Sequence, residues 1–499
     1  MTTTIKLFSK LCTTFSFSSF AFAIRRCLVL TLLVSGSIIF CGNIACAQSP
    51  SVPPKTANTT TTNTATANTA TPSTPATNTT EVPIAPEVKA GLEKAVAAFN
   101  ASKFPEALDL LKTLYTEHPN IMPPRIVLAQ WFAQANLGDA VRANLEMGTE
   151  ENPDDPEAYL LLGEIALRQR NLTAAELLLK QATEKLRAYS TNADRKKILS
   201  SSLLRVFADL YEARQRWAEM ETCLDEKIRF DGQNATHLRQ KGVAVFQQKR
   251  DEDAKKLFLQ ADQLEKTTPE SSQTQKGLPA DALMSQLYLV RGDRENAKKS
   301  LEAALAAHPN SKEVLALSIQ MRVNDDKLEE AKPLAEKLLA DDPTSASAKR
   351  LCATVALYLQ DYPKAEKLFQ ELLLESPTDS QAANGLALAL CEQDSPEKLK
   401  RALEYAADNV RKNQNNSEFW GTLGWIRYKL DQLEQAANAL KQSAATGQIN
   451  AATAYYLARL AVKTGKTDEA KQLLNAALQG NNQFAKRREA VKLLNELAK

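Results

Sequence analysis

Histidine is almost absent from this chain of 499 residues, which holds only three. His118, His237 and His308 lie far apart in sequence, and none belongs to an H-E-x-x-H pattern. The seven cysteines include no CxxC pair. Structural zinc sites and thioredoxin-like redox sites need such clustered ligands or thiols. The sequence therefore predicts no metal site and no cofactor.

Glycine is also scarce, with 16 residues, and the phosphate-binding and nucleophile motifs that depend on it are missing. The chain has no G-x₄-G-K-[ST] loop, no G-x-S-x-G elbow and no glycine-rich dinucleotide turn. Asp and Glu are plentiful, but their spacing puts them on exposed helix faces and at helix ends. We therefore predict that the protein is not an enzyme.

A basic surface is lacking once the N-terminus is set aside. The formal net charge is +3, but residues 1–47 carry four bases and no acid, so the remainder holds 58 bases against 59 acids. A chain with no basic run has no electrostatic footprint for nucleic acid. We predict that no nucleic acid is bound.

Residues 1–47 have the pattern of a signal peptide. Arg25 and Arg26 precede the apolar run CLVLTLLVSGSIIF, and Ala45-Cys46-Ala47 resembles a cleavage site. This predicts an exported protein, periplasmic or extracellular. Alternatives are a membrane anchor formed by residues 27–45, a lipid anchor on Cys46, or a twin-arginine signal. Contact with a membrane is expected only through such an uncleaved leader or lipid anchor.

Residues 48–85 form a linker of low complexity. Ser49–Thr80 consists of Thr, Asn, Ala, Pro and Ser apart from Val52 and Lys55. Such a segment has too little apolar surface to offset its chain entropy and is predicted to be disordered. It is interpreted as a plain spacer, with an O-glycosylated stalk as the alternative. The cysteines beyond the leader, Cys223, Cys352 and Cys391, are predicted to be buried free thiols.

A small residue, a bulky residue four positions later and a proline eight further on recur along the chain. In one unit these are Ala365, Phe369 and Pro377, and the marker position recurs at intervals that are mostly 34 residues, with longer gaps of 45, 43 and 37 before Met220, Ala297 and Ala402. A fixed period of this length indicates a solenoid. The small marker residues are Ala107, Val141, Ala175, Met220, Ala254, Ala297, Ala331, Ala365, Ala402, Ala436 and Ala470.

Each unit is predicted to be two helices. Small residues let two backbones approach closely. The bulky residue stands four positions later and so lies on the same helix face, where it fills a hole in the next unit. Proline then ends the second helix. His118 and His308 each precede such a proline and are predicted to be inter-repeat turn residues. Longer connections are expected within Lys185–Ser201 and at Thr267–Ala280.

The pattern resembles the tetratricopeptide repeat family. Trp420-x-x-Leu423-Gly424, followed by Ala436 and Leu440, follows the family pattern, although Arg427 stands where tyrosine is usual. Tyr159-x-x-Leu162-Gly163 with Ala175 and Leu179 matches nearly as well, and residues 361–377 fit the second helix best. The units around Met220 and Ala402 are degenerate.

The resemblance implies an all-α fold: a right-handed superhelical solenoid of about eleven helix–turn–helix repeats over residues 86–483. Residues 484–499 are predicted to form a C-terminal capping helix, with Val491, Leu494 and Leu497 on its buried face. Its basic residues are predicted to lie elsewhere, facing solvent. They are Lys486, Arg487, Arg488 and Lys492.

The resemblance also implies a groove on the concave side, lined by fixed positions of the first helices. In the C-terminal units those positions mix aromatic, cationic and polar side chains. They are Arg350, Thr354, Tyr358, Asn384, Trp425, Tyr428, Lys429, Tyr455, Arg459 and Lys463. The N-terminal positions are more apolar and acidic: Leu92, Val96, Phe99, Gln130, Leu160, Glu164, Asp209 and Glu212.

These features predict a non-catalytic protein–protein interaction scaffold that acts outside the cytoplasm. Aromatic residues interleaved with cations are typical of interfaces, so we expect the groove to bind an extended, acidic or carboxylate-bearing segment of a protein partner. The alternative is an accessory component of an envelope-assembly or polysaccharide-export machine.

Overall fold

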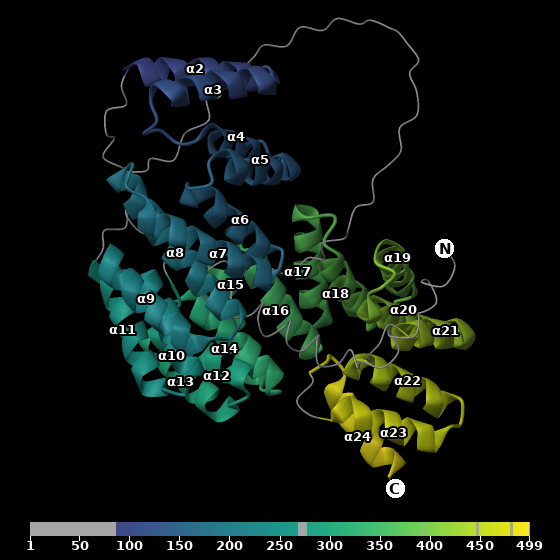
Figure 1. The fold of residues 1–499 in the computed structure, drawn as a ribbon. Helices are drawn as coiled ribbons and strands as arrows, with labels where there is room; N and C mark the ends of the chain where they lie inside the picture. The colour runs from purple at the N-terminus through teal and green to yellow at the C-terminus, as the bar shows by residue number, and fades with distance from the viewer. Residues whose placement is uncertain (1–85, 268–276, 394, 446–448, 480–482, 499) are drawn as a thin grey trace, which may run out of the picture. The chain divides into compact units, whose positions relative to one another are not determined.

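The computed structural model describes residues 86–267, 277–393, 395–445, 449–479 and 483–498. These residues form 23 α-helices, α2 to α24, and no strand (Figure 1). The predicted leader and linker lie outside the described residues, as does most of the connection at Thr267–Ala280. None of the described helices is both long enough and apolar enough to cross a membrane.

The helices fall into two compact units, which divide between Pro269 and Glu270. The first unit contains α2 (Pro86–Asn100), α3 (Phe104–Glu117), α4 (Pro124–Gln134), α5 (Gly138–Glu151), α6 (Pro156–Arg168), α7 (Leu172–Ala188), α8 (Ala193–Ala213), α9 (Trp217–Asp231), α10 (Ala235–Gln247) and α11 (Asp251–Thr267). These are five helix pairs, each packed as an antiparallel hairpin.

The second unit contains six further pairs and one terminal helix. Its helices are α12 (Ala280–Arg291), α13 (Arg294–Ala307), α14 (Lys312–Asn324), α15 (Leu328–Asp341), α16 (Ala346–Tyr358), α17 (Tyr362–Glu375), α18 (Ser380–Cys391), α19 (Pro396–Lys412), α20 (Ser417–Lys429), α21 (Leu433–Ala445), α22 (Ala451–Lys463), α23 (Thr467–Leu478) and α24 (Arg487–Leu497). The described residues thus contain the eleven helix pairs that the repeat predicts.

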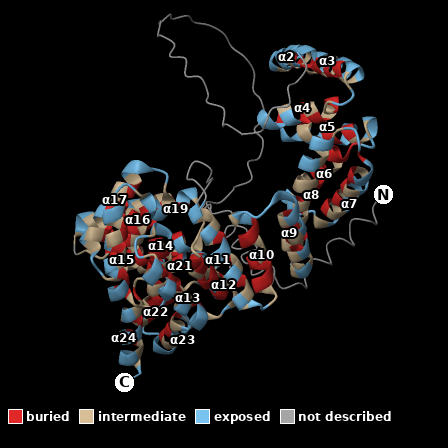
Figure 2. Cartoon of the chain, turned by 90° about the vertical axis from the view of Figure 1, so that its left-hand side faces the viewer, coloured by how far each residue is buried: buried red, intermediate tan, exposed pale blue. Residues whose placement is uncertain are grey.

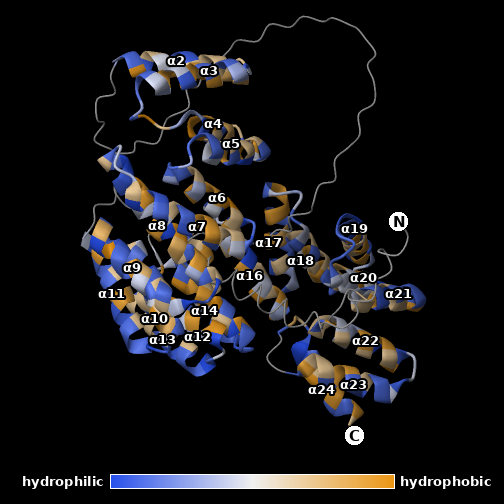
Figure 3. Ribbon diagram, in the orientation of Figure 1, coloured by the Kyte–Doolittle hydropathy of each residue, from blue (hydrophilic) through white to orange (hydrophobic). Residues whose placement is uncertain are grey.

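The small marker residues of the repeat are buried between helices. Ten of the eleven are 0% exposed, and Val141 is half-buried. Figure 2 shows the buried residues on the sides where paired helices meet, and in Figure 3 hydrophobic and hydrophilic residues alternate around the helices. The pattern is that of amphipathic helices which bury one stripe against a partner. It confirms that the repeating skeleton sets the helix packing.

The bulky residue of the repeating pattern packs against a glycine. A Cβ atom added to that glycine would collide with the bulky side chain. At Gly424 on α20 the added atom would lie 2.6 Å from Cγ of Leu440 on α21. At Gly385 on α18 it would collide with the ring of Phe369 on α17. The bulky side chain therefore fills a hole in the next unit at Phe369, as predicted, but in its own unit at Leu440.

The turn inside a helix pair has a recurring backbone conformation. In the described part of the chain, ten of these turns contain a residue with positive φ. Two of the ten residues, Gly292 and Gly465, are glycines. At Arg170, the φ of 61° lets the amide of Asn171 donate to the carbonyl of Ala166 at 2.9 Å. This bond satisfies a carbonyl at the helix end, as in a Schellman motif.

Polar caps and prolines set many of the other helix boundaries. Ser345 accepts a hydrogen bond from the amide of Ala348, and Asp361 accepts one from Lys364. Helix α13 ends at Ala307, and His308 is its C-cap before Pro309, as predicted for an inter-repeat turn. Within Lys185–Ser201, the longer connection consists of two lengthened helices and a short loop, as predicted.

Helix α24 packs beside α23, but its buried face differs from the predicted one. Val491 is 44% exposed, whereas Ala490 and Leu493 are buried, and Lys486 is only 5% exposed. The buried positions 490 and 493 stand one residue before the predicted 491 and 494, whereas Leu494 and Leu497 of the predicted face are half-buried and pack against the core. Lys486 is buried despite its charge because acidic groups of earlier repeats surround it.

Candidate functional site

The side chain of Glu392, the residue after α18, is a point where several repeats meet. It is 8% exposed. Nε1 of Trp425 on α20 donates to Oε1 of Glu392 at 2.6 Å. Oε2 of Glu392 lies 2.9 Å from Nζ of Lys486 and 3.4 Å from Nζ of Lys429. A carboxylate from the ninth helix pair is thus shared by the tenth pair and the segment that begins α24.

The charges at this point stabilise one another. Burial would raise the pKa of Glu392, but the cations of Lys486 and Lys429 and the bond from Trp425 hold its pKa below the usual value. Burial would likewise lower the pKa of Lys486, but Glu392, Tyr362 and Glu489 raise it well above the ordinary lysine value. Both groups are therefore charged near neutral pH, and each needs the other because it is buried.

Aromatic rings from α20 and α22 form a layer beside Glu392. The ring of Trp425 stacks on those of Tyr428 and Tyr456, with centroids 5.2 and 4.8 Å apart. The ring of Tyr455 lies 5.9 Å from Trp425 and 5.9 Å from Phe484. Trp425 and Tyr455 are buried, whereas Tyr428 is half-buried. The layer thus presents one accessible ring above a buried support.

Cations lie over the exposed side of this layer. Nζ of Lys429 is 5.9 Å from the ring centroid of Trp425, and Nζ of Lys463 is 5.3 Å from that of Tyr428. Lys463 also forms an ion pair with Asp431. Arg459 interacts with the hydroxyl of Tyr428, and its Nε atom has no hydrogen-bond partner among the described residues. Both lysines are partly neutralised by the chain's own carboxylates.

Six of the ten groove residues predicted in the C-terminal units therefore come together in this layer. The other four, Arg350, Thr354, Tyr358 and Asn384, lie on α16 and α18, and two of them are near Glu418. The amide of Asn384 donates to Glu418 at 3.0 Å, and burial with the nearby Glu418 charge raises the pKa of Tyr358 to about 12. Arg350 pairs with Asp379 at 2.5 Å. Whether either group binds a partner stays a prediction.

Sequence reasoning missed the acidic members of the site. Glu392 and Glu418 stand at helix boundaries, where an acid carries no signal of its own. The contact between Glu392 and Lys486 spans 94 residues. Such a pair has no local pattern, so the repeat period could not have identified it.

The first unit carries its own acidic group at the predicted positions of α6 and α8. Arg205 lies 3.2 Å from Glu164 and 3.5 Å from Asp209. Burial raises the pKa of Asp209 to about 6 and that of Glu212 to about 7, with a further increase at Glu212 from the charge of Asp209. This group is a cluster of acids partly balanced by arginine, without further sign of a ligand.

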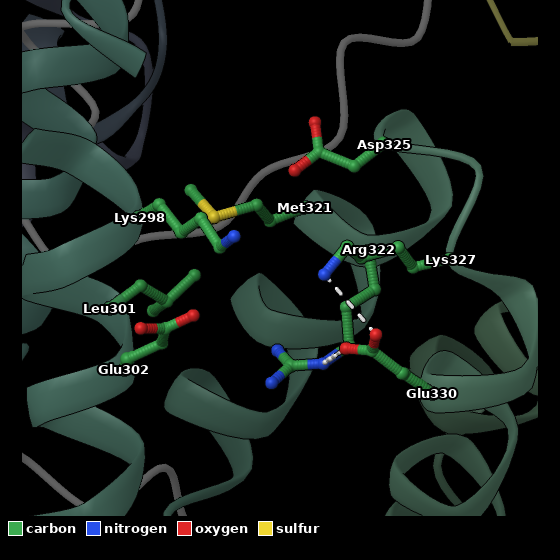
Figure 4. Close-up of a pocket in the computed structure, with 8 residues that line it drawn as sticks. All are labelled: Lys298, Leu301, Glu302, Met321, Arg322, Asp325, Lys327 and Glu330. Atoms are coloured by element: carbon green, nitrogen blue, oxygen red, sulfur yellow. Dashed lines mark ion pairs between the residues drawn. The ribbon is translucent and has the colours of Figure 1, made fainter. Parts of the chain in front are cut away.

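The pockets of the described residues differ in size, and the one lined by Tyr115, Asp155 and Arg195 holds about 530 Å³. The pocket in Figure 4, between α13 and α14, holds about 10 Å³, which is room for a single water. Three of its charged residues are engaged with one another, since Glu330 lies 3.2 Å from Lys327 and 3.6 Å from Arg322. No group of His, Cys, Asp or Glu in the described residues could hold a metal ion.

The three predicted thiols are free and buried, as expected from their sequence context. Burial raises the pKa of Cys223 to about 12 and that of Cys391 well above its usual value. A thiol that keeps its proton is a poor nucleophile. These cysteines are therefore packing residues.

Comparison of the sequence with models of protein families finds the repeat that the sequence pattern resembles. Residues 133–193, 323–389 and 422–485 match models of the tetratricopeptide repeat. No curated protein matches the chain by sequence.

Several solved structures are similar over nearly the whole of their own length and over part of this chain. A tetratricopeptide repeat protein from Parabacteroides merdae is 13% identical, with a TM-score of 0.42, over 53% of this chain and 99% of its own. A thermophilic repeat protein from Thermus thermophilus is 20% identical, with a TM-score of 0.33, over 38% and 99%. Yeast Tom70 is 13% identical, with a TM-score of 0.32, over 83% and 96%. The three matched segments therefore show that these parts of the chain are similar to tetratricopeptide repeats.

Proposed function

We propose that the protein is a non-catalytic scaffold that acts outside the cytoplasm and holds a segment of a partner protein on the first helices of its second unit. The observation that carries this proposal is the aromatic and cationic layer on α20 and α22. Its accessible members are Tyr428, Lys429, Arg459 and Lys463.

The composition of this layer supports protein binding. Tyrosine and arginine are enriched among the residues that dominate interface energy, and such residues work best on a rigid, well-packed support. Here the support is the buried pair Trp425 and Tyr455. A partner side chain laid on Tyr428 would gain apolar contact without ordering a mobile loop.

Affinity capture from the native envelope fraction tests the proposal. The site variant carries Arg459→Glu with Lys463→Glu, and the charge-matched control carries Lys441→Glu with Lys492→Glu, two exposed lysines outside the layer. We expect the parent and the control to recover the same partners and the site variant to lose them. Equal recovery by all three proteins would refute the proposed site.

The proposed location rests on the leader sequence. Arg25 and Arg26, the apolar run and Ala45-Cys46-Ala47 favour export with cleavage before Gln48. Intact-mass measurement of protein purified from its native envelope fraction tests this. A mature chain that begins at Gln48 is expected. A chain that retains residues 1–47 would refute cleavage and favour the anchor formed by residues 27–45.

A further inference from the structure

Residues 483–489, which we call the tail segment, contact repeats far away in sequence. The side chain of Gln483 donates to the carbonyl of Asn324 at 3.2 Å. Arg488 makes two bonds of 3.0 Å to the carboxylate of Glu329. In a solenoid each repeat normally touches only its neighbours. The tail segment instead reaches from the eleventh helix pair to the seventh.

Between these two ends the tail segment contacts the eighth, ninth and eleventh pairs. Nζ of Lys486 lies 3.0 Å from the hydroxyl of Tyr362 and 2.9 Å from Glu392. Glu489 accepts bonds of 3.1 Å from Gln360 and from the hydroxyl of Tyr455. The surface that it covers, which we call the tail-contact surface, consists of Asn324, Glu329, Gln360, Tyr362, Glu392 and Tyr455.

The tail-contact surface is complementary to a cationic segment. Its two carboxylates, Glu329 and Glu392, face Arg488 and Lys486, and Asp326 lies 3.9 Å from Arg488. Glu392 is buried and accepts a hydrogen bond from Trp425, one of the rings of the layer described above, and Tyr455, another of these rings, donates to Glu489 of the tail segment. The surface is therefore continuous with the proposed partner site, and it already holds a basic segment of the chain itself.

We propose that the tail-contact surface binds a basic segment of a partner protein, and that the tail segment occupies it as a tethered competitor. The resident segment shows what fits: an aromatic residue, a lysine two positions later and an arginine two positions after that, as at Phe484, Lys486 and Arg488. A lysine or arginine of the partner replaces Lys486 at Glu392. The partner segment that binds this surface is thus cationic, whereas the sequence predicts an acidic segment for the groove.

Exchange is physically accessible because the outer contacts of the tail segment are open to water. The side chains of Arg488 and Glu329 are 49% and 68% exposed, and such exposed ion pairs hold weakly. Once Arg488 is released, the tail segment is held by the bonds of Gln483, Lys486 and Glu489 and by the buried ring of Phe484. A partner that brings its own cation keeps Glu392 paired throughout the exchange, so no buried charge is left alone.

This inference rests on the proposed scaffold function, and a synthetic peptide of residues 483–499 tests it separately. The variant Lys486→Glu with Arg488→Glu releases the tail segment by placing acids against Glu392 and Glu329. The control, Lys441→Glu with Lys492→Glu, changes the charge equally; Lys492 lies on the exposed side of α24, and its ion-pair partner there is Glu496. Binding of the fluorescent peptide to each full protein is measured by anisotropy.

We expect the peptide to bind the released variant about tenfold or more tightly than the parent or the control, because the tethered competitor is gone. A peptide with Lys486→Glu and Arg488→Glu should bind the released variant about tenfold more weakly than the native peptide. Equal dissociation constants for the three proteins, or for the two peptides, would overturn the inference. If capture of partners still separates the groove variant from its control, the scaffold function survives that outcome.

Hydrogen exchange gives a second readout that needs no peptide. Amides of α24 should exchange faster in the released variant than in the parent, while those of α20 keep their protection. Unchanged protection of α24 would show that these ion pairs do not hold the tail segment, and would overturn the inference. If the double variant fails to fold, the single variant Arg488→Glu replaces it, because this change alters only the exposed pair with Glu329. It should change peptide binding and hydrogen exchange in the same direction, but less.

Discussion

Lys486 and Glu392 stand 94 residues apart, yet Nζ of the lysine lies 2.9 Å from the carboxylate. Both side chains are more than nine-tenths buried. The pair joins the C-terminal helix to the ninth helix pair, across two intervening pairs. The stability of the second unit should therefore depend on a contact that the repeat pattern does not contain.

Replacing Lys486 by methionine should destabilise the protein. The change removes the main cation from the buried carboxylate of Glu392, which keeps only Lys429 and Trp425 as partners. The free energy of unfolding should therefore fall by about 3 kcal/mol. Lys492→Met, on the exposed side of the same helix, should change the free energy of unfolding by less than about 0.5 kcal/mol. Urea unfolding of both variants measures the difference. Equal effects would contradict the role of the pair.

The contribution of this pair should depend on pH in a defined direction. The pKa of Glu392 is lowered in the folded state, so its stabilisation is present above the ordinary glutamate pKa of about 4.3 and is lost as pH falls through the folded value. The pKa of Lys486 is raised in the folded state. The stabilisation that this lysine contributes is therefore present below about pH 10.4 and is lost only as pH rises through the pKa of the folded protein.

Unfolding of the parent and of Lys486→Met across pH isolates this effect. The difference between their free energies of unfolding should stay constant from about pH 6 to pH 9 and shrink below about pH 4, since other carboxylates cancel in the comparison. A difference that persists undiminished at about pH 3 would mean that the ion pair is not its source.

Ala365→Phe should disrupt the packing of the eighth helix pair. Ala365 is 0% exposed between helices, and a bulky ring there would force its neighbours apart at a cost of about 1–3 kcal/mol. Lys367→Ala, at an exposed position of the same helix, should stay within about 0.5 kcal/mol. Chemical denaturation of the two variants checks the register of the repeat, which equal effects would refute.

Gly292→Ala should weaken the turn between α12 and α13. The φ of Gly292 is 89°, in the left-handed region, where a Cβ atom costs about 1–2 kcal/mol. Gly138→Ala is the matched control, because Gly138 begins a helix and an added Cβ meets nothing within 4 Å. We expect Gly292→Ala to lower the urea midpoint and Gly138→Ala to leave it unchanged or raise it. A stabilised Gly292→Ala protein would contradict the turn assignment.

The helix pairs could be predicted because their contacts are periodic and close in sequence. A marker such as Ala365 packs against its own pair and the next, so one unit's pattern repeats in the others. Even the degenerate units around Met220 and Ala402 fold as helix pairs, since burial of the small position is enough without the full motif.

The candidate site could be predicted only in part. The aromatic and cationic residues of α20 and α22 occupy regular helix positions, and the structure brings them together. Glu392 and the tail segment lie outside that regularity. The hydrophobic pattern of residues 484–498 suggested a buried Val491, but Ala490 and Leu493 are buried in its place, and Lys486 is buried against Glu392 of a distant repeat.

The bonds from Gln483 and Arg488 to the seventh helix pair close a ring of about five repeats within the second unit. An open array frays from its last repeat, because that repeat has one neighbour. Here the terminal helix cannot detach without also breaking its bonds to Asn324 and Glu329, so loss of the last repeat is coupled to the middle of the unit. As long as the tail segment stays bound, the end of the chain should thus unfold in step with the repeats it touches, which makes the C-terminus a poor starting point for proteolytic trimming.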